Sequence, residues 1–154
     1  MSELLGDQER RILAVLQQNA ALPVAEIAER VGMSVSPCWR KIQALQKNGT
    51  IRGRVALIEP EKVGLRVTVF TQIKLTDHRR ETIADFKREI DALPQVQECH
   101  LLIGDVDCML KILVPDLDTY QEFYFDRLAP LPMVREVTSM MALSPLKQTT
   151  EVPL

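Results

Sequence analysis

The sequence predicts an α+β chain in two parts, a head of three short helices and a body of βαββαβ order. Within residues 7–49 the apolar residues recur every three or four positions, which is the period of amphipathic helices. From residue 67 onward, alternating segments typical of strands are interleaved with helical ones. Two of these strands, 96–103 and 108–114, are separated only by residues 104–107, and so short a gap indicates an antiparallel hairpin.

The first two helices of the head are bounded by clear end signals. The first is predicted over 8–18, with Asp7 as its cap, and the second over 24–31, between Pro23 and Gly32. Their apolar stripes are Ile12, Leu13 and Leu16 in the first helix and Val24, Ile27, Ala28 and Val31 in the second. Each helix therefore presents one face to a common core.

The third helix completes a helix-turn-helix. Ser34 is its expected cap, and Gly49 supplies the left-handed residue that ends it. Only Gly32 and Met33 separate that cap from the second helix, which is the tight connection of this motif. The core-facing stripe is Val35, Cys38, Ile42 and Leu45.

The opposite face of the third helix and the segment after it carry the predicted DNA contacts. In a helix-turn-helix the third helix enters the major groove with its N-terminal residues against the base edges. Residues 50–58 alternate around Gly53 and are expected to form a short ribbon or wing whose arginines reach phosphates. The predicted DNA-binding residues are Ser34, Ser36, Pro37, Trp39, Arg40, Lys41, Gln43, Lys47, Arg52 and Arg54.

The distribution of charge favours DNA as the partner of the head over the main alternative, in which the head docks another protein. Residues 1–54 hold eight Lys and Arg against five Asp and Glu, whereas residues 55–154 hold eleven against sixteen. An exposed Trp39 would suit a protein interface. No acidic residue stands between Val31 and Ile58, however, and that stretch contains five cations. We therefore expect the head to bind DNA.

The body reads as a ferredoxin-like split βαβ fold, an antiparallel sheet with two helices on one face. After a first strand at 67–75, a helix is predicted over 82–93; Asp116 or Asp118 caps the second helix, and a last strand runs from 134 to about 143. The helical residues expected in the core are Ile83, Phe86, Ile90 and Leu93, then Leu117, Tyr120, Tyr124 and Leu128. The other face of the sheet is too apolar for open water, so we expect self-association through it. Its candidate residues are Phe70, Leu101, Leu113 and Met141.

Composition and motifs argue against membrane and catalytic classes. The 154 residues are 46% hydrophobic and 26% charged, with no secretory start and no run of the roughly 20 apolar residues that a membrane span needs, so a cytoplasmic protein is expected. No phosphate-binding glycine loop, nucleophile elbow or paired-histidine zinc motif occurs, and we expect no enzyme activity, metal or cofactor. Cys38, Cys99 and Cys108 are odd in number and scattered, and are expected to be buried structural residues.

The segment "GDVD", residues 104–107, is the candidate ligand site. The amide of Gly104 in a hairpin bend is open to a carboxylate, and the acids Asp105 and Asp107 can accept an ammonium group; together they match the two ends of a free amino acid. A plain turn has the same composition, because Asp and Gly are the commonest turn residues. Taken by itself, the segment leaves both interpretations open.

The two parts together resemble the leucine-responsive and asparagine-responsive (Lrp/AsnC) transcriptional regulators over essentially the whole chain. The matching segments are "SPCWRK", "NGTIRGRVALIEPEKVGL", "ECHLLIGDVDCMLKILVPD" with the family's Gly-Asp-x-Asp signature, and "LPMVREVTSMMALSPLK". The "PCW" variant with "RVALIEPEKVGL" looks most like the branch that governs cysteine detoxification. An aromatic residue often follows the second acid in the family; here it is Cys108, which implies a smaller or differently shaped pocket.

The resemblance implies a winged helix-turn-helix domain at 1–54, a hinge strand or linker at 55–65, and a ferredoxin-like (RAM- or ACT-like) ligand-sensing and oligomerisation domain at 66–154. It also implies homodimers, and rings such as octamers, on a palindromic operator in double-stranded DNA. The expected effector-binding residues are Gly104, Asp105, Asp107, Thr138 and Ser139. We predict a sequence-specific DNA-binding regulator that responds to an amino acid. The alternative is a small-molecule or amino-acid enzyme on the body, with the head as a protein-docking module.

Overall fold

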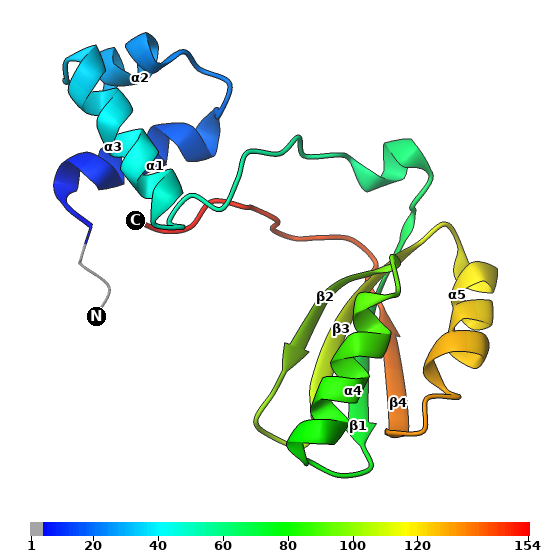
Figure 1. Ribbon diagram of the computed structural model, residues 1–154. Helices are drawn as coiled ribbons and strands as arrows, with labels where there is room; N and C mark the ends of the chain where they lie inside the picture. Colours follow the sequence, from blue (N-terminus) through cyan, green and yellow to red (C-terminus); the bar gives the residue numbers. More distant parts are fainter. Residues whose placement is uncertain (1–4) are drawn as a thin grey trace. The chain divides into compact units, whose positions relative to one another are not determined.

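The computed structural model describes residues 5–154, so residues 1–4 of the predicted first domain lie outside the described part. The chain forms two compact units, one of Met1–Leu57 with Lys147–Leu154 and the other of Ile58–Leu146. Figure 1 traces both units along the sequence. The chain therefore passes from one unit to the other twice, once after Leu57 and once after Leu146.

The C-terminal segment pairs with the first helix, α1 (Asp7–Gln18). The Val152 amide donates to Gln17 Oε1 at 2.5 Å, and Gln17 Nε2 donates to the Val152 carbonyl at 3.1 Å. One side-chain amide thus satisfies both backbone groups of a residue, as a neighbouring strand would. Residues 147–154 consequently group with the N-terminal unit, whereas the sequence led us to place them in the C-terminal domain.

The helices α1, α2 (Val24–Arg30) and α3 (Val35–Lys47) form the three-helix head that the sequence predicts. Their buried side chains meet in one cluster of Ile12, Leu13, Leu16, Ile27, Ala28, Val31, Cys38, Ile42 and Leu45. The predicted cap of α1 is wrong, because Asp7 is the first residue of the helix and Gly6 holds the N-cap position. Asp7 still favours the helix, since a carboxylate in the first turn faces the positive end of the helix dipole.

The ends of α3 follow the sequence signals with one exception. Ser34 occupies the N-cap position but its side chain makes no capping hydrogen bond, and Gly49, with φ of +80°, follows the helix in the left-handed region. Gly32, with φ of +69°, makes the turn between α2 and α3. Val35, which was expected in the core, is 50% exposed because the buried stripe begins one turn later, at Cys38.

Residues 51–59, predicted as a wing or ribbon that continues into a hinge strand, are irregular in this chain. A ribbon needs a second strand to share its backbone hydrogen bonds, and none lies beside this segment in the described part of the chain. Ile51 is nevertheless anchored, because its amide donates to the Leu45 carbonyl at 2.9 Å and its side chain packs on the helical core. A short 3-10 helix, η1 (Pro60–Val63), then leads to the first strand.

The C-terminal unit confirms the predicted βαββαβ order. Its elements are β1 (Val67–Leu75), α4 (Arg80–Asp91), β2 (Val96–Leu101), β3 (Cys108–Val114), α5 (Leu117–Phe123), the π-helix η2 (Tyr124–Leu128) and β4 (Val134–Met141). All neighbouring strands are antiparallel, in the order β2-β3-β1-β4. This is the ferredoxin-like plan, with β1 and β3 at the centre of the sheet.

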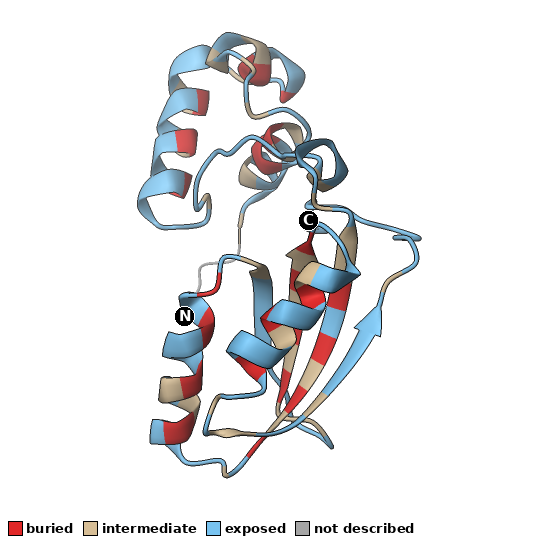
Figure 2. Cartoon of the chain, turned by 90° about the vertical axis from the view of Figure 1, so that its right-hand side faces the viewer, coloured by how far each residue is buried: buried red, intermediate tan, exposed pale blue. Residues whose placement is uncertain are grey.

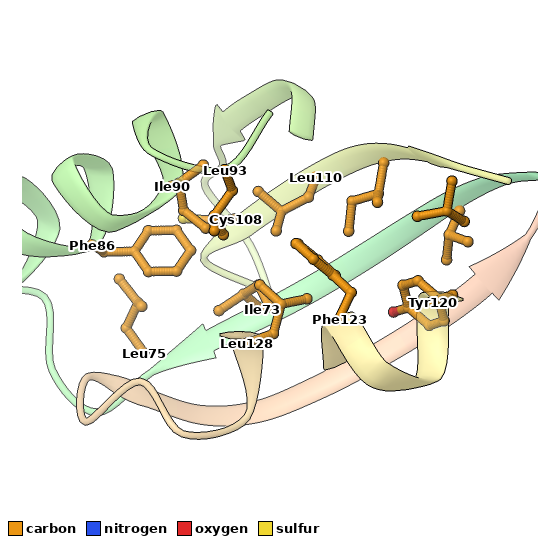
Figure 3. Packing of buried hydrophobic residues seen from close by; sticks show 13 residues of the cluster. Ile73, Leu75, Phe86, Ile90, Leu93, Cys108, Leu110, Tyr120, Phe123 and Leu128 are labelled. Carbon is orange, nitrogen blue, oxygen red and sulfur yellow. The ribbon is translucent and has the colours of Figure 1, made fainter. Parts of the chain in front are cut away.

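The core of this unit lies between one face of the sheet and the helices α4 and α5 (Figure 3). Every second residue of the central strands is buried there, because successive side chains of a strand point to opposite faces. Figure 2 shows this alternation of buried and less buried residues along the sheet. The strand residues of the core are Val69, Ile73 and Leu75 from β1 and Cys108, Leu110, Ile112 and Val114 from β3.

The structure corrects two residues on the predicted buried face of α5. Asp116 is the cap, since its carboxylate accepts from the Thr119 amide at 2.8 Å. Leu117, predicted in the core, is 52% exposed, and Phe123, which we did not predict, is 5% exposed. Leu117 is the first residue of α5, whereas Tyr120 and Phe123 lie three residues apart and share the face of the helix that packs on the core.

The open face of the sheet is mixed in character. Phe70 and Met140 lie opposite each other on β1 and β4 and are 38% and 46% exposed, and the half-buried Leu113 lies on the same face. Leu101 and Met141 pair with Cys108 and Val69, so they belong to the helix-covered side instead. Of the four residues expected on this face, two are there, because strand register decides the face and the sequence does not show the register.

Candidate nucleic-acid interface and effector loop

The exposed side of α3 gathers most of the predicted DNA contacts. Cys38, Ile42 and Leu45 bury one side of the helix. The residues left on the exposed side are Ser36, Trp39, Arg40, Gln43 and Lys47, with Ser34 exposed and Pro37 half-buried at its start. Trp39 is 52% exposed, and Val35, one turn before it, extends the apolar part of this surface. A helix that presents cations, amides and an aromatic ring from its first turns has the chemistry to contact phosphates and base edges.

Lys41 differs from the other predicted DNA contacts because a neighbouring helix engages it. Its ammonium forms a hydrogen-bonded ion pair with Glu9 Oε1 of α1, and both side chains are largely shielded from water. The hydrogen bond from Lys41 lowers the pKa of Glu9. Arg40, the preceding residue, is exposed. The structure therefore separates two adjacent cations that the sequence treated alike, one holding α3 to α1 and one facing outward.

The two arginines of the irregular segment also differ. Arg54 Nη1 donates to the Ala20 carbonyl at 3.2 Å, which ties the segment to the loop between α1 and α2. Arg52 is exposed. A cavity of about 420 Å³ lies alongside, lined by leucines of α1, residues 50–54, Val152 and Leu154. The base of the predicted wing thus lines one cavity together with α1 and the C-terminal segment, all within the same unit.

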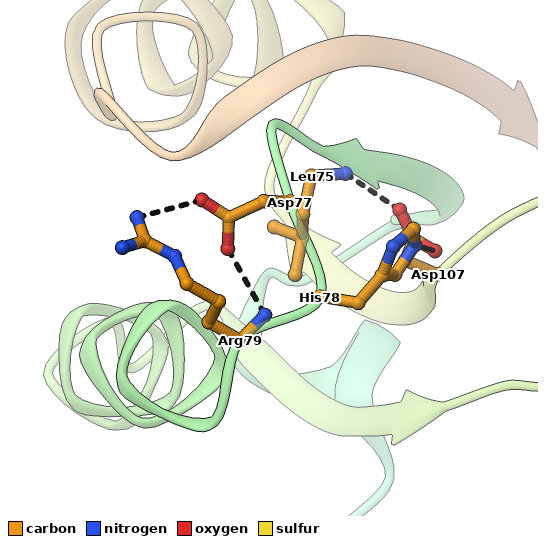
Figure 4. A network of polar contacts seen from close by, with 5 residues as sticks. All are labelled: Leu75, Asp77, His78, Arg79 and Asp107. Atoms are coloured by element: carbon orange, nitrogen blue, oxygen red, sulfur yellow. Dashed lines mark hydrogen bonds and ion pairs between the residues drawn. The ribbon is translucent and has the colours of Figure 1, made fainter.

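Asp107, the second acid of the predicted effector loop, is a structural anchor (Figure 4). Its Oδ2 accepts from the Leu75 amide at 2.7 Å, and its Oδ1 lies 2.6 Å from His78 Nε2. Its own amide donates to the Ile73 carbonyl at 3.0 Å, and its carbonyl accepts from the Leu102 amide at 2.8 Å. Asp107 therefore closes the hairpin loop and holds it against the end of β1. The Leu75 amide, together with His78, lowers the pKa of Asp107.

A second carboxylate orders the turn that follows β1. Asp77 accepts from the Arg79 amide at 3.0 Å and from Thr82 Oγ1 at 2.6 Å, and it pairs with the Arg79 guanidinium at 2.9 Å. These donors, the guanidinium first, hold the pKa of Asp77 well below its usual range. The turn that presents His78 to Asp107 is thus held by its own hydrogen bonds (Figure 4).

Other residues of the loop are exposed to solvent. Gly104 and Asp105 are exposed, and Gly104 has a φ of +153°, which other residues rarely adopt. Leu102 and Ile103, just before them, are 38% and 107% exposed, so the loop also offers an apolar surface.

The two predicted partners on β4 lie on opposite faces of the sheet. Ser139 pairs with Thr71, and its hydroxyl joins Tyr120 and Thr71 in a cluster on the helix-covered side, with 3.1 Å between Thr71 Oγ1 and the Tyr120 hydroxyl. Thr138 pairs with Gln72 on the open face. One pocket on one face of the sheet cannot contain both side chains.

Sequence reasoning missed two polar residues that share the open face with Thr138. The register runs from Thr138 through Gln72 and Met109 to His100, so Gln72 and His100 stand in one row across the sheet. No signal in the sequence points to them, because the row is formed by four strands whose register only the folded sheet defines.

Among residues 5–154, no three His, Cys, Asp or Glu side chains are grouped as a metal site requires. Within the same range, no helix combines the length and apolar character of a membrane span.

Known proteins match both units of the chain. Residues 68–152 match the Lrp/AsnC ligand binding domain, and residues 5–52 match a winged helix-turn-helix DNA-binding domain. The DNA-binding transcriptional activator DecR of Escherichia coli (strain K12) is 34% identical over 98% of this chain and 99% of its own. An AsnC family transcriptional regulator from Agrobacterium tumefaciens has a crystal structure with 40% identity and a TM-score of 0.92 over 97% of both chains. A transcriptional regulator of Neisseria meningitidis, crystallised as an L-Met complex, has 31% identity and a TM-score of 0.92 over 97% of both chains.

The anchoring role of Asp107 gives a test through pH. Because its folded-state pKa lies below the unfolded value of about 3.9, its contribution to the free energy of unfolding is complete above that value and is lost as pH falls through the folded pKa. We expect Asp107→Asn to lower stability by about 1–2 kcal/mol at pH 6, measured by urea unfolding, with the difference from wild type shrinking near pH 3. The control is Asp105→Asn in the exposed part of the loop, which should change stability by less than about 0.5 kcal/mol. An equal effect of the two substitutions would contradict the anchoring role.

Proposed function

Because this chain belongs to the Lrp/AsnC family of transcriptional regulators, we propose that it is a non-enzymatic regulator that reads DNA with α3 and responds to a free amino acid. The observation that carries the proposal is the exposed side of α3, which places Trp39, Arg40 and Gln43 outward from a helix whose other side is buried. In this division of labour residues 1–54 contact DNA, residues 55–65 act as a hinge, and residues 66–154 sense the effector and assemble the protein. Because its proposed partner is DNA, we also place the protein in the cytoplasm.

Within the DNA surface, each side chain has a proposed part. Arg40 reads guanine, because a guanidinium can donate to O6 and N7 of the base together. Lys47, Arg52 and Arg54 contact phosphates, and Ser36 and Gln43 have the donors and acceptors for base edges or phosphates. Ser34, Pro37 and Trp39 complete the surface at the start of the helix. Lys41 contributes mainly by orienting α3 through its ion pair with Glu9.

The proposed assembly is a homodimer, with higher-order rings such as octamers, on a palindromic operator. A two-fold pair of helix-turn-helix units reads two half-sites about one helical turn apart, which accounts for the palindrome. The open face of the sheet supports such an assembly, since Phe70 and Met140 stand side by side there and are exposed in the single chain.

The proposed effector is an α-amino acid bound at the exposed part of the hairpin loop. The L-Met complex of the Neisseria meningitidis relative supports this ligand class. Gly104 and Asp105 offer an amide for the carboxylate and a carboxylate for the ammonium, and the exposed Leu102 and Ile103 offer contacts for a side chain. Asp107 shapes the loop, and Thr138 is the better placed of the two β4 candidates because Ser139 is bound within the helix-covered cluster. That the effector is cysteine, as the detoxification branch would imply, stays a prediction.

The DNA surface is tested by separating the two adjacent cations. We expect Arg40→Ala to weaken binding by about 1–3 kcal/mol, or roughly tenfold or more in Kd, with an unchanged melting temperature. Lys41→Ala should instead lower stability by up to about 1 kcal/mol, because it breaks the ion pair with Glu9. The measurements are gel shifts at several salt concentrations, on a duplex selected from random DNA for binding to this protein, and thermal unfolding. Undiminished DNA binding by Arg40→Ala would refute the proposed reading role of α3.

The effector site is tested at Asp105 rather than at the anchor Asp107. Wild-type binding to the selected duplex should change when the cognate amino acid, found by screening the free amino acids, is added; coupling of about 1–3 kcal/mol is typical. Asp105→Asn should lose that response and keep the effector-free affinity. Asp118→Asn, an exposed acid at the start of α5, is the matched control and should respond like wild type. A full response in Asp105→Asn would place the effector elsewhere.

The assembly is tested on the open face. We expect the double variant Phe70→Glu and Met140→Glu to reduce the oligomer in sedimentation velocity at micromolar concentration. Two carboxylates on neighbouring strands would have to lose their water in the subunit contact without gaining a partner of opposite charge. Phe125→Glu, at a residue 61% exposed on η2, is the control and should leave the sedimentation profile unchanged. If the double variant assembles like wild type, subunit contact lies on another surface.

A further inference from the structure

Two of the three cysteines stand on adjacent strands and on the same face of the sheet. We propose that Cys99 and Cys108 form a redox pair, in which a hydroperoxide oxidises Cys99 and Cys108 then closes an intrachain disulfide between β2 and β3. The third cysteine, Cys38, is fully buried in the helical core of the other unit and takes no part. This proposal is independent of the proposed regulatory function, because its readout needs neither DNA nor effector.

The strand register brings the two thiols together. Cys99 pairs with Leu110 and Leu101 pairs with Cys108, so both cysteines point to the helix-covered side of the sheet. The Leu102 amide donates to the Asp107 carbonyl, which makes 102 and 107 a hydrogen-bonded pair and leaves the cysteine positions in the non-hydrogen-bonded pairs, where side chains approach more closely. Cys99 and Cys108 are diagonal neighbours in these pairs, and the right-handed twist of the strands draws this diagonal together.

Closing the disulfide needs a small movement that β2 can supply. Diagonal neighbours lie about 7–8 Å apart between Cα atoms, and a disulfide spans up to about 6.8 Å. β2 is an edge strand, and its pairing already shifts register between Val96 and Glu98. Its residues after Val96 are exposed, so little packing resists a shift of about 1 Å toward β3.

The surroundings assign different parts to the two sulfur atoms. All three cysteines were expected to be buried, but Cys99 is exposed because it lies on the edge strand β2, whereas Cys108 on the central strand β3 is 2% exposed. A hydrogen bond from the Cys108 thiol lowers the pKa of Cys99, and the nearby His100 and Lys87 act in the same direction against Asp91. The same hydrogen bond and burial raise the pKa of Cys108. Cys99 is therefore the accessible thiol, which attacks when it is deprotonated, and Cys108 is the protected thiol that resolves.

The chemistry balances with a hydroperoxide as the oxidant. The Cys99 thiolate attacks the terminal oxygen of the peroxide, the O–O bond breaks, and the departing alkoxide or hydroxide takes a proton and leaves as alcohol or water. Cys99 is then a sulfenic acid. Cys108 sulfur attacks the Cys99 sulfur, the S–O bond breaks, and the hydroxide leaves as water with the Cys108 proton. Two thiols lose two electrons together, and the peroxide gains them.

The disulfide would act on the hairpin that carries the loop of residues 102–107. That loop is held on the β3 side by Asp107 and its bonds to β1, whereas β2 on the other side is exposed. A covalent link from Cys99 to Cys108 fastens the free side of the hairpin next to the loop. Oxidation would thus change the freedom of the loop without altering the residues that form it.

The test uses the full-length protein, reduced, freed of reductant and treated with hydrogen peroxide. After denaturation and alkylation, intact mass spectrometry should show loss of two alkylatable thiols and of two hydrogens, with Cys38 still alkylated, and dithiothreitol should reverse the change. A non-reducing peptide map should locate the bond between Cys99 and Cys108. All three thiols alkylated after treatment, or a bond between Cys99 residues of two chains, would overturn the proposal.

Single substitutions assign the order of events. Cys99→Ser should abolish the oxidised species, and Cys108→Ser should instead accumulate a sulfenic acid at Cys99 that dimedone traps. Cys38→Ser is the control and should form the disulfide at the wild-type rate. Circular dichroism checks that the variants fold, and the wild-type peptide map does not depend on them. Dimedone labelling of Cys108 rather than Cys99 in the single variants would overturn the assignment of attacking and resolving thiols.

Discussion

The burial of one face of β1 and β3 beneath α4 and α5 is the constraint on which the C-terminal unit depends. A strand places successive side chains on opposite faces, so once Val69 and Ile73 enter the core, Phe70 and Gln72 must face the other way. The same alternation holds in β4, because its residues pair with those of β1. It sends Ser139 into the helix-covered cluster and Thr138 to the open face. The candidate surfaces of the unit are thus consequences of its core.

Several polar residues on or beside the proposed binding surfaces also form hydrogen bonds within the chain. Lys41 is bonded to Glu9, Arg54 to the Ala20 carbonyl, and Asp107 to the Leu75 amide and His78. Such bonds hold neighbouring elements in place, and a surface that must recognise a specific partner benefits from being held before that partner arrives. Arg40 and Asp105, each a close neighbour of an anchored residue, remain exposed. In both units an anchored side chain thus lies beside one that is free to bind.

The hairpin of β2 and β3 joins the two proposals made for the C-terminal unit. Its β3 side is central in the sheet and is tied to β1 by Asp107, while its β2 side is an exposed edge. A loop with one firm and one loose side can respond to a ligand or to a covalent link, because small changes at the loose side have little packing to overcome. The proposed amino-acid site and the proposed thiol pair lie on the same loop and strand, so oxidation and effector binding would act on one local structure.

The sequence by itself determined the order of the elements and the approximate position of each along the chain. Periodicity and end signals located the helices of the head and the strands of the body, because amphipathic period and capping are local properties, and the motifs around Pro37 and Gly104 indicated the family. Tertiary structure decided what each side chain does. Lys41 and Arg40 are alike in sequence, and only the packing of α1 against α3 distinguishes them. The helix face that holds Phe123 rather than Leu117, the strand register that separates Thr138 from Ser139 and the approach of Cys99 to Cys108 depend on contacts between residues distant in the sequence, and local periodicity carries no information about these.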